Sequence, residues 1–220
     1  MIRVVIFDFD GTLADTNGVK EACLHRTVAE LNGGAAALAA ARQEGGDRSQ
    51  IFAKVAQQLS ANSDAQAVAA QARALVDAYS RCCASGIAAA PERSGAVRTL
   101  AALARRRLHL WVLSATPDRH LVGLLRRRGL VCWLKGSLGS SVTKEDGLRR
   151  IMAIERADRN SVLLVGDGPD DQRAARAVGV KFAAVVAENR IAARGRFAVR
   201  DLRPLVPLID SLNSGRRLSA

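Results

Sequence analysis

The stretch Val4-Val-Ile-Phe-Asp-Phe-Asp-Gly-Thr-Leu-Ala-Asp15 joins a short apolar run to two closely spaced acids. Residues 4–7 are apolar and mostly β-branched, which is typical of a parallel strand buried on both faces. Asp8 and Asp10 follow at the carboxyl end of that strand, the edge at which open parallel sheets bind their ligands. Two carboxylates this close repel each other unless a cation or a shared proton relieves them. The stretch therefore predicts a strand that leads into a divalent-metal site; the alternative is a solvated acidic loop.

The composition is that of an ordinary globular protein. The chain has 220 residues, of which 49% are hydrophobic, so it can bury a core and hold one domain or a domain with an insert. Cys23, Cys82, Cys83 and Cys132 show no metal-ligand spacing, and we interpret them as reduced and mostly buried. The sequence shows no signal-peptide pattern and no apolar run of about 18 residues. Together these features predict a cytoplasmic protein that does not enter a membrane.

The net charge of +12 raises the question of a nucleic-acid partner. Part of the excess lies in two arginine runs, 105–107 and 126–128, at the ends of two predicted helices, where cations complement the helix dipole. Aromatic residues make up only 4% of the chain, and none forms a stacking stripe between basic residues. These features argue against a nucleic-acid partner, whereas a basic field would attract small phosphate anions.

Two regimes of composition predict a core domain with a helical insert. Residues 1–15 and 91–212 alternate short apolar runs with amphipathic stretches, the pattern of repeated strand–helix units. Residues 16–90 instead carry apolar positions at helical spacing, with glycine pairs as breaks. Residues 213–220 are expected to form a polar tail.

The predicted fold class is therefore α/β: a Rossmann-like, doubly wound parallel sheet with an α-helical cap inserted after the first strand. An insert at this position would cover the strand ends and the acidic site. The predicted strands are 4–8, 108–114, 131–134, 162–166 and 181–185. The predicted helices of the core are 95–106, 118–128, 144–155 and 169–178.

Two motifs in the second half of the core are candidates for anion binding. Ser114 and Ala115 follow the second predicted strand, where a hydroxyl and exposed amides could receive a phosphate; the alternative is a simple helix cap. Lys144 lies at the start of a predicted helix, although the helix dipole favours acids there. A phosphate or a carboxylate cluster would explain this lysine; the alternative is a solvated side chain.

A second acidic group follows the predicted strand 162–166. Asp170 and Asp171 lie at the start of a helix, which by itself favours acids. That preference does not explain Asp167, which precedes Gly168 and Pro169. Three acids at another strand end again indicate a cation site.

These motifs, in this order, resemble the four motifs of the haloacid dehalogenase-like hydrolase superfamily: Asp8-Phe-Asp10-Gly-Thr-Leu, Ser114, Lys144 and Gly166-Asp167-Gly-Pro-Asp-Asp171. The resemblance covers residues 1–15 and 91–210. The insert resembles the helical cap of the phosphoglycolate phosphatase, β-phosphoglucomutase and phosphonatase branches. Dehalogenases of the superfamily lack the second acid, so Asp10 argues for phosphate chemistry.

The resemblance implies a Mg²⁺-dependent phosphatase that acts on a small phosphorylated metabolite. It implies that Asp8 attacks phosphorus to form an aspartyl phosphate, and that Asp10 protonates the leaving oxygen and then activates water. Mg²⁺ would be held by Asp8, the backbone carbonyl of Asp10 and Asp167, with Asp171 in support. Hydroxyl, amide and ammonium groups would hold the phosphoryl oxygens, and the residues that carry them are Gly11, Thr12, Ser114, Ala115 and Lys144.

The sequence leaves the substrate open. Lys20, Arg48 and Lys54 of the insert are candidate contacts for the anionic end of a substrate, although each could be an ordinary surface charge. A phosphomutase or a phosphonate hydrolase, the latter with Lys20 or Lys54 as a Schiff-base lysine, is the nearest alternative. A non-catalytic basic binding module is another. The sequence does not indicate the oligomeric state.

Overall fold

The computed structural model describes residues 1–46, 48–60, 64–186 and 197–214. The chain divides into two compact units. We call Met1–Asp15 together with Pro91–Ala220 the core unit, and Thr16–Ala90 the helical unit. The N–H of Asp15 donates to the carbonyl of Pro91 at 2.9 Å, so the chain leaves the core unit and returns to it at neighbouring points. The helical unit is therefore an insertion into one loop of the core.

Within the described residues, six parallel strands form the sheet of the core unit, in the order β3-β2-β1-β4-β5-β6. The strand that contains the opening apolar run is β1, and its neighbours are β2 and β4. This arrangement confirms the predicted parallel α/β fold. The strands are β1 Val4–Phe7, β2 His109–Leu113, β3 Gly136–Leu138, β4 Val162–Gly166, β5 Lys181–Val185 and β6 Phe197–Val199.

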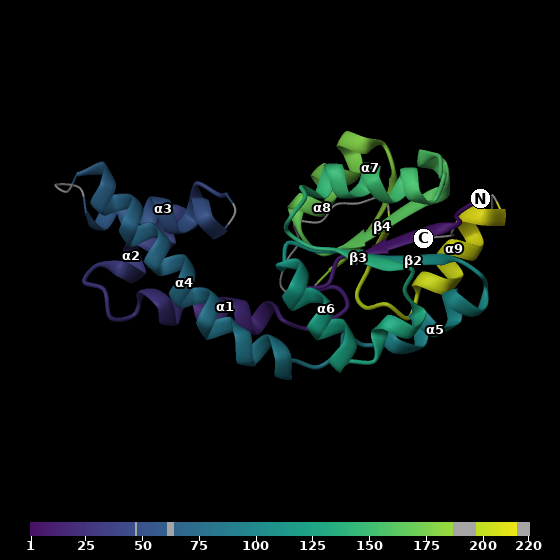
Figure 1. Ribbon diagram of the computed structural model, residues 1–220, viewed down its shortest axis with the longest axis horizontal. Coiled ribbons are helices and arrows are strands. Elements are labelled where there is room, and N and C mark those ends of the chain that lie inside the picture. Colours follow the sequence, from purple (N-terminus) through teal and green to yellow (C-terminus); the bar gives the residue numbers. More distant parts are fainter. Residues whose placement is uncertain (47, 61–63, 187–196, 215–220) are drawn as a thin grey trace. The chain divides into compact units, whose positions relative to one another are not determined.

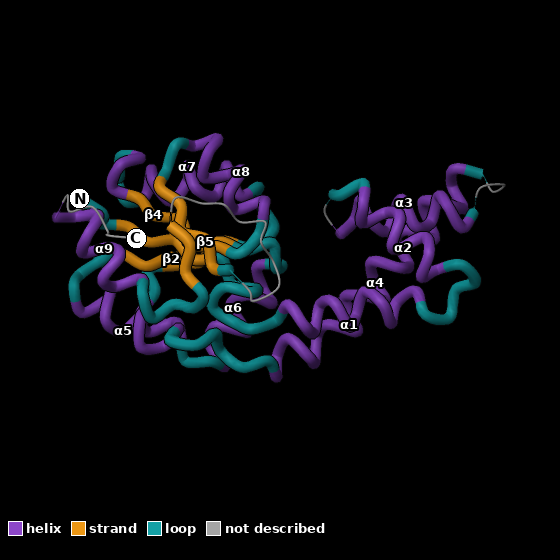
Figure 2. The backbone as a smooth tube through the Cα atoms, turned by 180° about the vertical axis from the view of Figure 1, so that it is seen from behind, coloured by secondary structure: helices purple, strands orange, loops and turns teal. Residues whose placement is uncertain are grey.

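Helices cover both faces of this sheet. Helices α7 and α8 lie on one face, and α5, α6 and α9 lie on the other (Figures 1 and 2). The four predicted core helices and four of the five predicted strands begin and end within one residue of the observed elements. The helices are α5 Ala96–Arg105, α6 Asp118–Arg127, α7 Lys144–Ile154, α8 Pro169–Val178 and α9 Leu205–Ser214.

The central strand β1 is buried on both faces. Val4 and Ile6 pack in a cluster with Leu148 and Ile151 of α7, and Phe7 is fully buried. Because each fully buried large apolar side chain contributes about 1.5–3 kcal/mol, this strand is held firmly between its layers. The position of the residue that follows it, Asp8, is fixed accordingly.

Two expectations about the core unit are wrong, and two of its elements were not predicted. The predicted strand 131–134 is a 3₁₀ helix, Leu130–Trp133, and the third strand is instead Gly136–Leu138. Strand β6 and helix α9 were not predicted at all. Asn213 and Ser214, expected in the tail, belong to α9, and the amide of Asn213 bonds the backbone of Ile2; residues 215–220 of that tail lie outside the described residues.

The helical unit has its own hydrophobic core, in which the rings of Phe52 and Tyr79 lie 5.7 Å apart. The sequence did not reveal the break between its last two helices, α3 and α4. The side chain of Asp64 caps the start of α4 by accepting a hydrogen bond from the N–H of Ala67 at 2.7 Å. Among the described residues, no helix is both long and apolar enough to cross a lipid bilayer. The helices are α1 Asn17–Val28, α2 Gly34–Gln43, α3 Arg48–Leu59 and α4 Ala65–Ala89.

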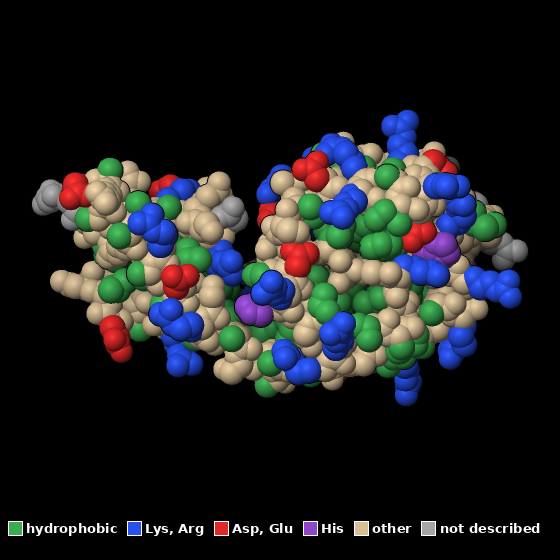
Figure 3. Space-filling model, viewed as in Figure 1, with side chains coloured by type: hydrophobic (Ala, Val, Ile, Leu, Met, Phe, Trp, Pro, Cys, Tyr) green, Lys and Arg blue, Asp and Glu red, His purple; other side chains and the backbone are tan. Residues whose placement is uncertain are grey.

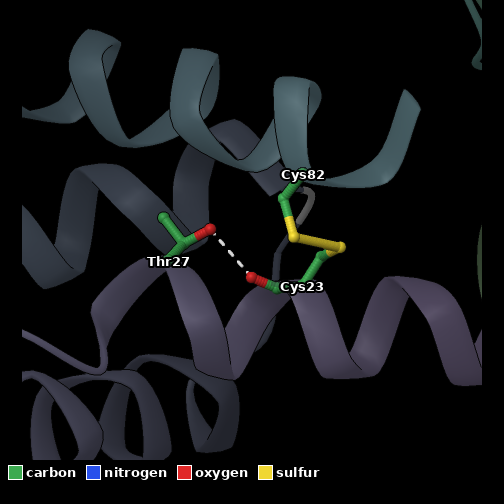
Figure 4. The surroundings of a disulfide bond; sticks show 3 residues. All are labelled: Cys23, Thr27 and Cys82. Carbon is green, nitrogen blue, oxygen red and sulfur yellow. Dashed lines mark hydrogen bonds between the residues drawn. A yellow bond between two sulfur atoms is a disulfide. The ribbon is translucent and has the colours of Figure 1, made fainter. Parts of the chain in front are cut away.

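A disulfide corrects the prediction that the cysteines are reduced. Cys23 of α1 and Cys82 of α4 are bonded, with their Cα atoms 5.7 Å apart (Figure 4). Cys83 is buried and Cys132 is exposed, and neither belongs to this bond. The interpretation missed the pair because the two residues are 59 positions apart and meet only when α1 packs on α4. Reduced cysteines therefore no longer support a cytoplasmic location.

Candidate active site

The ends of three adjacent strands bring the predicted site residues together. Asp8 follows β1, Ser114 follows β2 and Asp167 follows β4, and β1 lies between the other two strands. The N–H of Asp8 extends the ladder by donating to the carbonyl of Val165 at 2.8 Å. Because all three strands are parallel, their carboxyl ends lie at one edge of the sheet.

Three carboxylates form a cluster at this edge. Asp8, Asp167 and Asp171 each offer one carboxylate oxygen, and these oxygens all lie within 4.8 Å of one another. Asp171 lies in the first turn of α8, is 1% exposed and accepts from the N–H of Gly168 at 3.1 Å. A Cβ atom on Gly166 would lie only 2.3 Å from Cγ of Asp171. Glycine at 166 is therefore what lets Asp171 approach the strand end.

Lys144 connects this cluster to α7. It is the first residue of the helix, and its ammonium pairs with Asp171 and, at 3.1 Å, with Oδ1 of Asp8. Burial lowers the pKa of Lys144, but the attraction of Asp8 and Asp171 outweighs burial and holds the pKa above its ordinary value of 10.5. Burial raises the pKa of the Asp171 carboxyl, and the ammonium opposes that rise. The expected carboxylate partner of Lys144 is thus present.

Asp10 has a different partner from Asp8, although only one residue separates them. The hydroxyl of Thr116 donates to Oδ2 of Asp10 at 2.8 Å, and Asp10 is 8% exposed. The sequence alone did not indicate a role for Thr116. The signal was a hydroxyl two residues after Ser114. The two acids of the opening motif are therefore held by different elements.

Two residues of the turn after Asp10 differ from expectation. The N–H of Gly11 donates to the carbonyl of Ala14 at 2.8 Å, so the turn itself uses the donor that we expected to hold a phosphoryl oxygen. Gly11 has a φ of 79°, a conformation that glycine adopts without strain. Thr12 is completely buried, and within the described residues its hydroxyl has no hydrogen-bond partner. Burial does not favour direct contact between Thr12 and a substrate.

The loop after β2 carries the remaining anion-binding candidates. Ser114 is 3% exposed, and its hydroxyl accepts from the N–H of Thr116 at 3.2 Å, whereas Ala115 is exposed. Asp118 braces the neighbouring loop by accepting from the N–H of Gly139 at 2.8 Å. Sequence reasoning did not identify this bracing role.

The three residues that the sequence offered as substrate contacts from the insert lie in the helical unit. Lys20 is in α1, and Arg48 and Lys54 are in α3. The guanidinium of Arg48 lies 5.4 Å from the ring centre of Tyr79. Lys54 donates to the carbonyl of Gly45 at 3.0 Å and pairs with Glu44. Arg48 and Lys54 therefore have interactions inside their own unit.

Comparison with known proteins gives the family. Residues 2–179 match the model of the haloacid dehalogenase-like hydrolases. The chain belongs to this family. It is accordingly a hydrolase, and the match spans the residues that carried the resemblance in the sequence.

Relatives of this hydrolase cover nearly the whole chain. A phosphoglycolate phosphatase of Rhodospirillum rubrum is 29% identical over 212 residues, and the match covers 91% of this chain and 88% of that protein. A haloacid dehalogenase-like hydrolase of Bacteroides fragilis has a TM-score of 0.74 and 22% identity, over 93% of this chain and all of its own. A HAD hydrolase of Bacillus subtilis, solved with bound magnesium, has a TM-score of 0.68 and 17% identity, over 95% and 99% of the two chains. The two solved structures share the fold of this hydrolase.

The acidic cluster of this hydrolase fits a divalent cation. When all four groups are ionised, the three carboxylates and the ammonium of Lys144 together carry a net charge of −2. Carboxylate oxygens are the ligands that Mg²⁺ and Ca²⁺ prefer. The side chain of Asp10 is not one of these three carboxylates.

Proposed function

We propose that this hydrolase is a Mg²⁺-dependent phosphatase of the phosphoglycolate phosphatase type, acting on a small phosphorylated metabolite. One observation carries the proposal: Asp8 and Asp10 lie next to each other but have different partners, Lys144 and Thr116. An ammonium beside Asp8 keeps that carboxylate ionised, as a nucleophile requires. A hydroxyl that orients Asp10 suits a group that must give up and recover a proton. The name of the Rhodospirillum rubrum relative supports this choice of activity.

In the first step, a carboxylate oxygen of Asp8 attacks phosphorus, and the bond from phosphorus to the ester oxygen breaks. Asp10 gives its proton to that leaving oxygen, so the alcohol departs neutral. The products of this step are an aspartyl phosphate on Asp8 and an ionised Asp10. The second acid thus becomes a base at the moment when a base is needed.

In the second step, Asp10 takes a proton from water, whose oxygen attacks phosphorus and displaces the carboxylate of Asp8. Inorganic phosphate leaves, and both acids return to their starting states. Lys144, the hydroxyl of Ser114 and the amide of Ala115 would hold the phosphoryl oxygens in line in both steps. Lys20, Arg48 and Lys54 remain predicted contacts for the remote end of the substrate.

The residues that would hold Mg²⁺ are Asp8, Asp167 and the backbone carbonyl of Asp10, with Asp171 in support. When bound, the ion supplies positive charge that offsets the charge developing on the phosphoryl oxygens. Asp171 also pairs with Lys144, so it would couple the metal site to the phosphate site.

The proposal is tested by phosphate release from a panel of phosphorylated metabolites, phosphoglycolate included, with Mg²⁺ and with a chelator. We expect Mg²⁺-dependent turnover that Asp8→Asn abolishes. Asp170→Asn is the matched control, because Asp170 lies on the same helix as Asp171 but is exposed and pairs with Arg173. Full activity in Asp8→Asn would exclude the mechanism, and isomerised sugar phosphate without free phosphate would indicate a mutase.

A further inference from the structure

A basic pocket lies at the edge of the sheet opposite the candidate active site. It is lined by the residues that precede or begin β1 and β2, among them Arg3, Arg106, Arg107 and His109, together with Glu155 from the end of α7. Figure 3 shows Lys and Arg side chains gathered at this end of the core unit. The residues of the acidic cluster follow the other ends of the strands. The pocket is therefore separate from the chemistry proposed above.

The acids near this pocket are already bound within the protein. Glu155 accepts from Nδ1 of His109 with one oxygen and from the indole N–H of Trp111, at 2.6 Å, with the other. Asp210 pairs with Arg106 at 3.2 Å. Within the part of the chain that the structure describes, no carboxylate pairs with the other three guanidinium groups at this edge, those of Arg3, Arg107 and Arg156. Positive charge therefore dominates the pocket.

The backbone at two of these arginines adopts a conformation that favours glycine. Arg107 has a φ of 60° and Arg156 a φ of 47°. Each is the first residue past a helix C-cap: the N–H of Arg107 donates to Ala104, and the N–H of Arg156 to Ala153. The N–H of the next residue closes the second bond of a Schellman motif in both cases, from Leu108 to Leu103 and from Ala157 to Met152.

Glycine is the usual residue at such helix ends, and this chain uses it elsewhere. Gly129 follows α6 with a φ of 64°, and Gly179 follows α8 with a φ of 81°. Attraction between a cation and a helix C-terminus explains a basic residue in the last turn, such as Arg105, without requiring a left-handed backbone. Arginine at 107 and 156 is thus present despite its local conformational cost. Such outliers point to a functional role for the side chain.

Arg156 belongs to the same surface as the pocket. The guanidinium of Arg3 donates to the backbone carbonyl of Arg156 at 3.5 Å, and Glu155, the preceding residue, lines the pocket. Two chain segments, the N-terminus and the end of α5, therefore bring guanidinium groups to the pocket, and the backbone of Arg156 at the end of α7 lies beside them. No single helix end creates this concentration of charge.

The arrangement of these groups indicates the class of ligand. Guanidinium groups bind phosphate oxygens in pairs of parallel hydrogen bonds, and several of them suit adjacent phosphoryl groups better than a single one. Among the described residues that line the pocket, there is no Phe, Tyr or Trp side chain on which a base of single-stranded nucleic acid could stack. We propose that this pocket binds a compact anion with two adjacent phosphoryl groups, which is either free diphosphate or the diphosphate moiety of a nucleotide.

Isothermal titration of the full chain with inorganic pyrophosphate, ADP and inorganic phosphate tests this proposal, with a chelator present to weaken binding at the acidic cluster. The key variant is Arg107→Gly, because Arg107 lines the pocket and glycine suits its backbone conformation, so the fold should keep or raise its melting temperature. Arg105→Ala is the control, since Arg105 is exposed on the last turn of the same helix and does not line the pocket. Loss of a charge-assisted contact should weaken pyrophosphate binding by about tenfold, whereas the control should not.

The titration with ADP distinguishes free diphosphate from the diphosphate moiety of a nucleotide. Equal affinity for ADP and pyrophosphate supports recognition of the diphosphate alone, and tighter binding of ADP supports a nucleotide. Unchanged pyrophosphate affinity in Arg107→Gly would overturn the proposal. So would an absence of pyrophosphate binding by the wild-type chain at roughly 0.15 M salt, including the case in which duplex DNA binds instead. Neither outcome bears on the proposed phosphatase activity, which is measured at the other edge of the sheet.

Discussion

Replacing Gly166 with alanine places a methyl group against Asp171 without changing any charged residue of the site. The new Cβ atom would lie 2.3 Å from Cγ of Asp171, whereas ordinary contact begins at 3.4 Å, so the two must separate by about 1.1 Å. Asp171 cannot move alone, because it accepts from the N–H of Gly168 and pairs with Lys144. We therefore expect the acidic cluster to lose its geometry.

The expected magnitudes follow from that displacement. Disturbing the groups that orient metal ligands typically weakens metal binding by about 10–100-fold, and we expect the affinity of Gly166→Ala for Mg²⁺ to fall within that range. Overpacking should lower the free energy of unfolding by about 1–3 kcal/mol. Part of this loss is offset by about 0.4–1 kcal/mol, because alanine restricts the unfolded chain.

Calorimetric titration with Mg²⁺ and denaturant unfolding measure the two effects separately. Gly18→Ala is the matched control: Gly18 lies in α1, and its Cβ atom would meet nothing within 4 Å. This control should keep its Mg²⁺ affinity and gain about 0.5–1 kcal/mol of stability. Wild-type Mg²⁺ affinity in Gly166→Ala would refute the role that we give to Asp171.

Three further predictions concern other parts of the chain. Thr116→Val should lower kcat about 10–100-fold with little change in KM, because the charged Asp10 loses a hydrogen bond. Thr116→Ser should restore the rate. Equal kcat in the wild type and both variants would contradict this role of Thr116. Because the pKa of Lys144 is raised in the folded state, its contribution to stability should be complete below pH 10.5 and lost only as the pH rises further. In urea unfolding, Lys144→Met should therefore lower the free energy of unfolding by the same amount at every pH from 6 to about 9. A decrease that disappears within that range would not support the ion pair. The disulfide between Cys23 and Cys82 spans 59 residues, so its reduction should lower the free energy of unfolding of the helical unit by about 2–4 kcal/mol. Cys132→Ala should not change that free energy. Identical unfolding with and without reductant would contradict the bond.

The sequence allowed the edge of the sheet that carries the acidic cluster to be predicted, because its signals are local. An apolar run that ends in an acid marks both a buried strand and the side of the sheet on which it stops, as at Asp8 and Asp167. Parallel order then brings these ends together. Lys144 could be singled out because an ammonium at a helix start conflicts with the dipole and needs a partner.

Features that depend on tertiary contacts escaped prediction. Residues 131–134 are apolar enough for a strand, but the ladder with β2 begins only where the N–H of Lys135 donates to Leu110. Among the described strands, the edge strand β3 pairs only with β2, so it needs no long apolar run. Cys82 rather than Cys83 bonds Cys23 because of which face α4 turns toward α1, which residue types do not reveal. The N–H of Gly11 is used within a turn whose hydrogen bonds depend on backbone angles.

The central claim is that Asp8 carries the phosphoryl group during turnover. Its most direct test is to quench the Asp10→Asn variant in acid during reaction with Mg²⁺ and an aryl phosphate whose phenolate leaves without a proton from Asp10, and then to locate phosphorus by peptide mass spectrometry. This variant should accumulate the intermediate, because it lacks the base that activates water. The account predicts phosphorus on the peptide that contains Asp8 and none in a variant that also carries Asp8→Asn. Phosphate release without any phosphorylated Asp8, or with phosphorus on another residue, would contradict it.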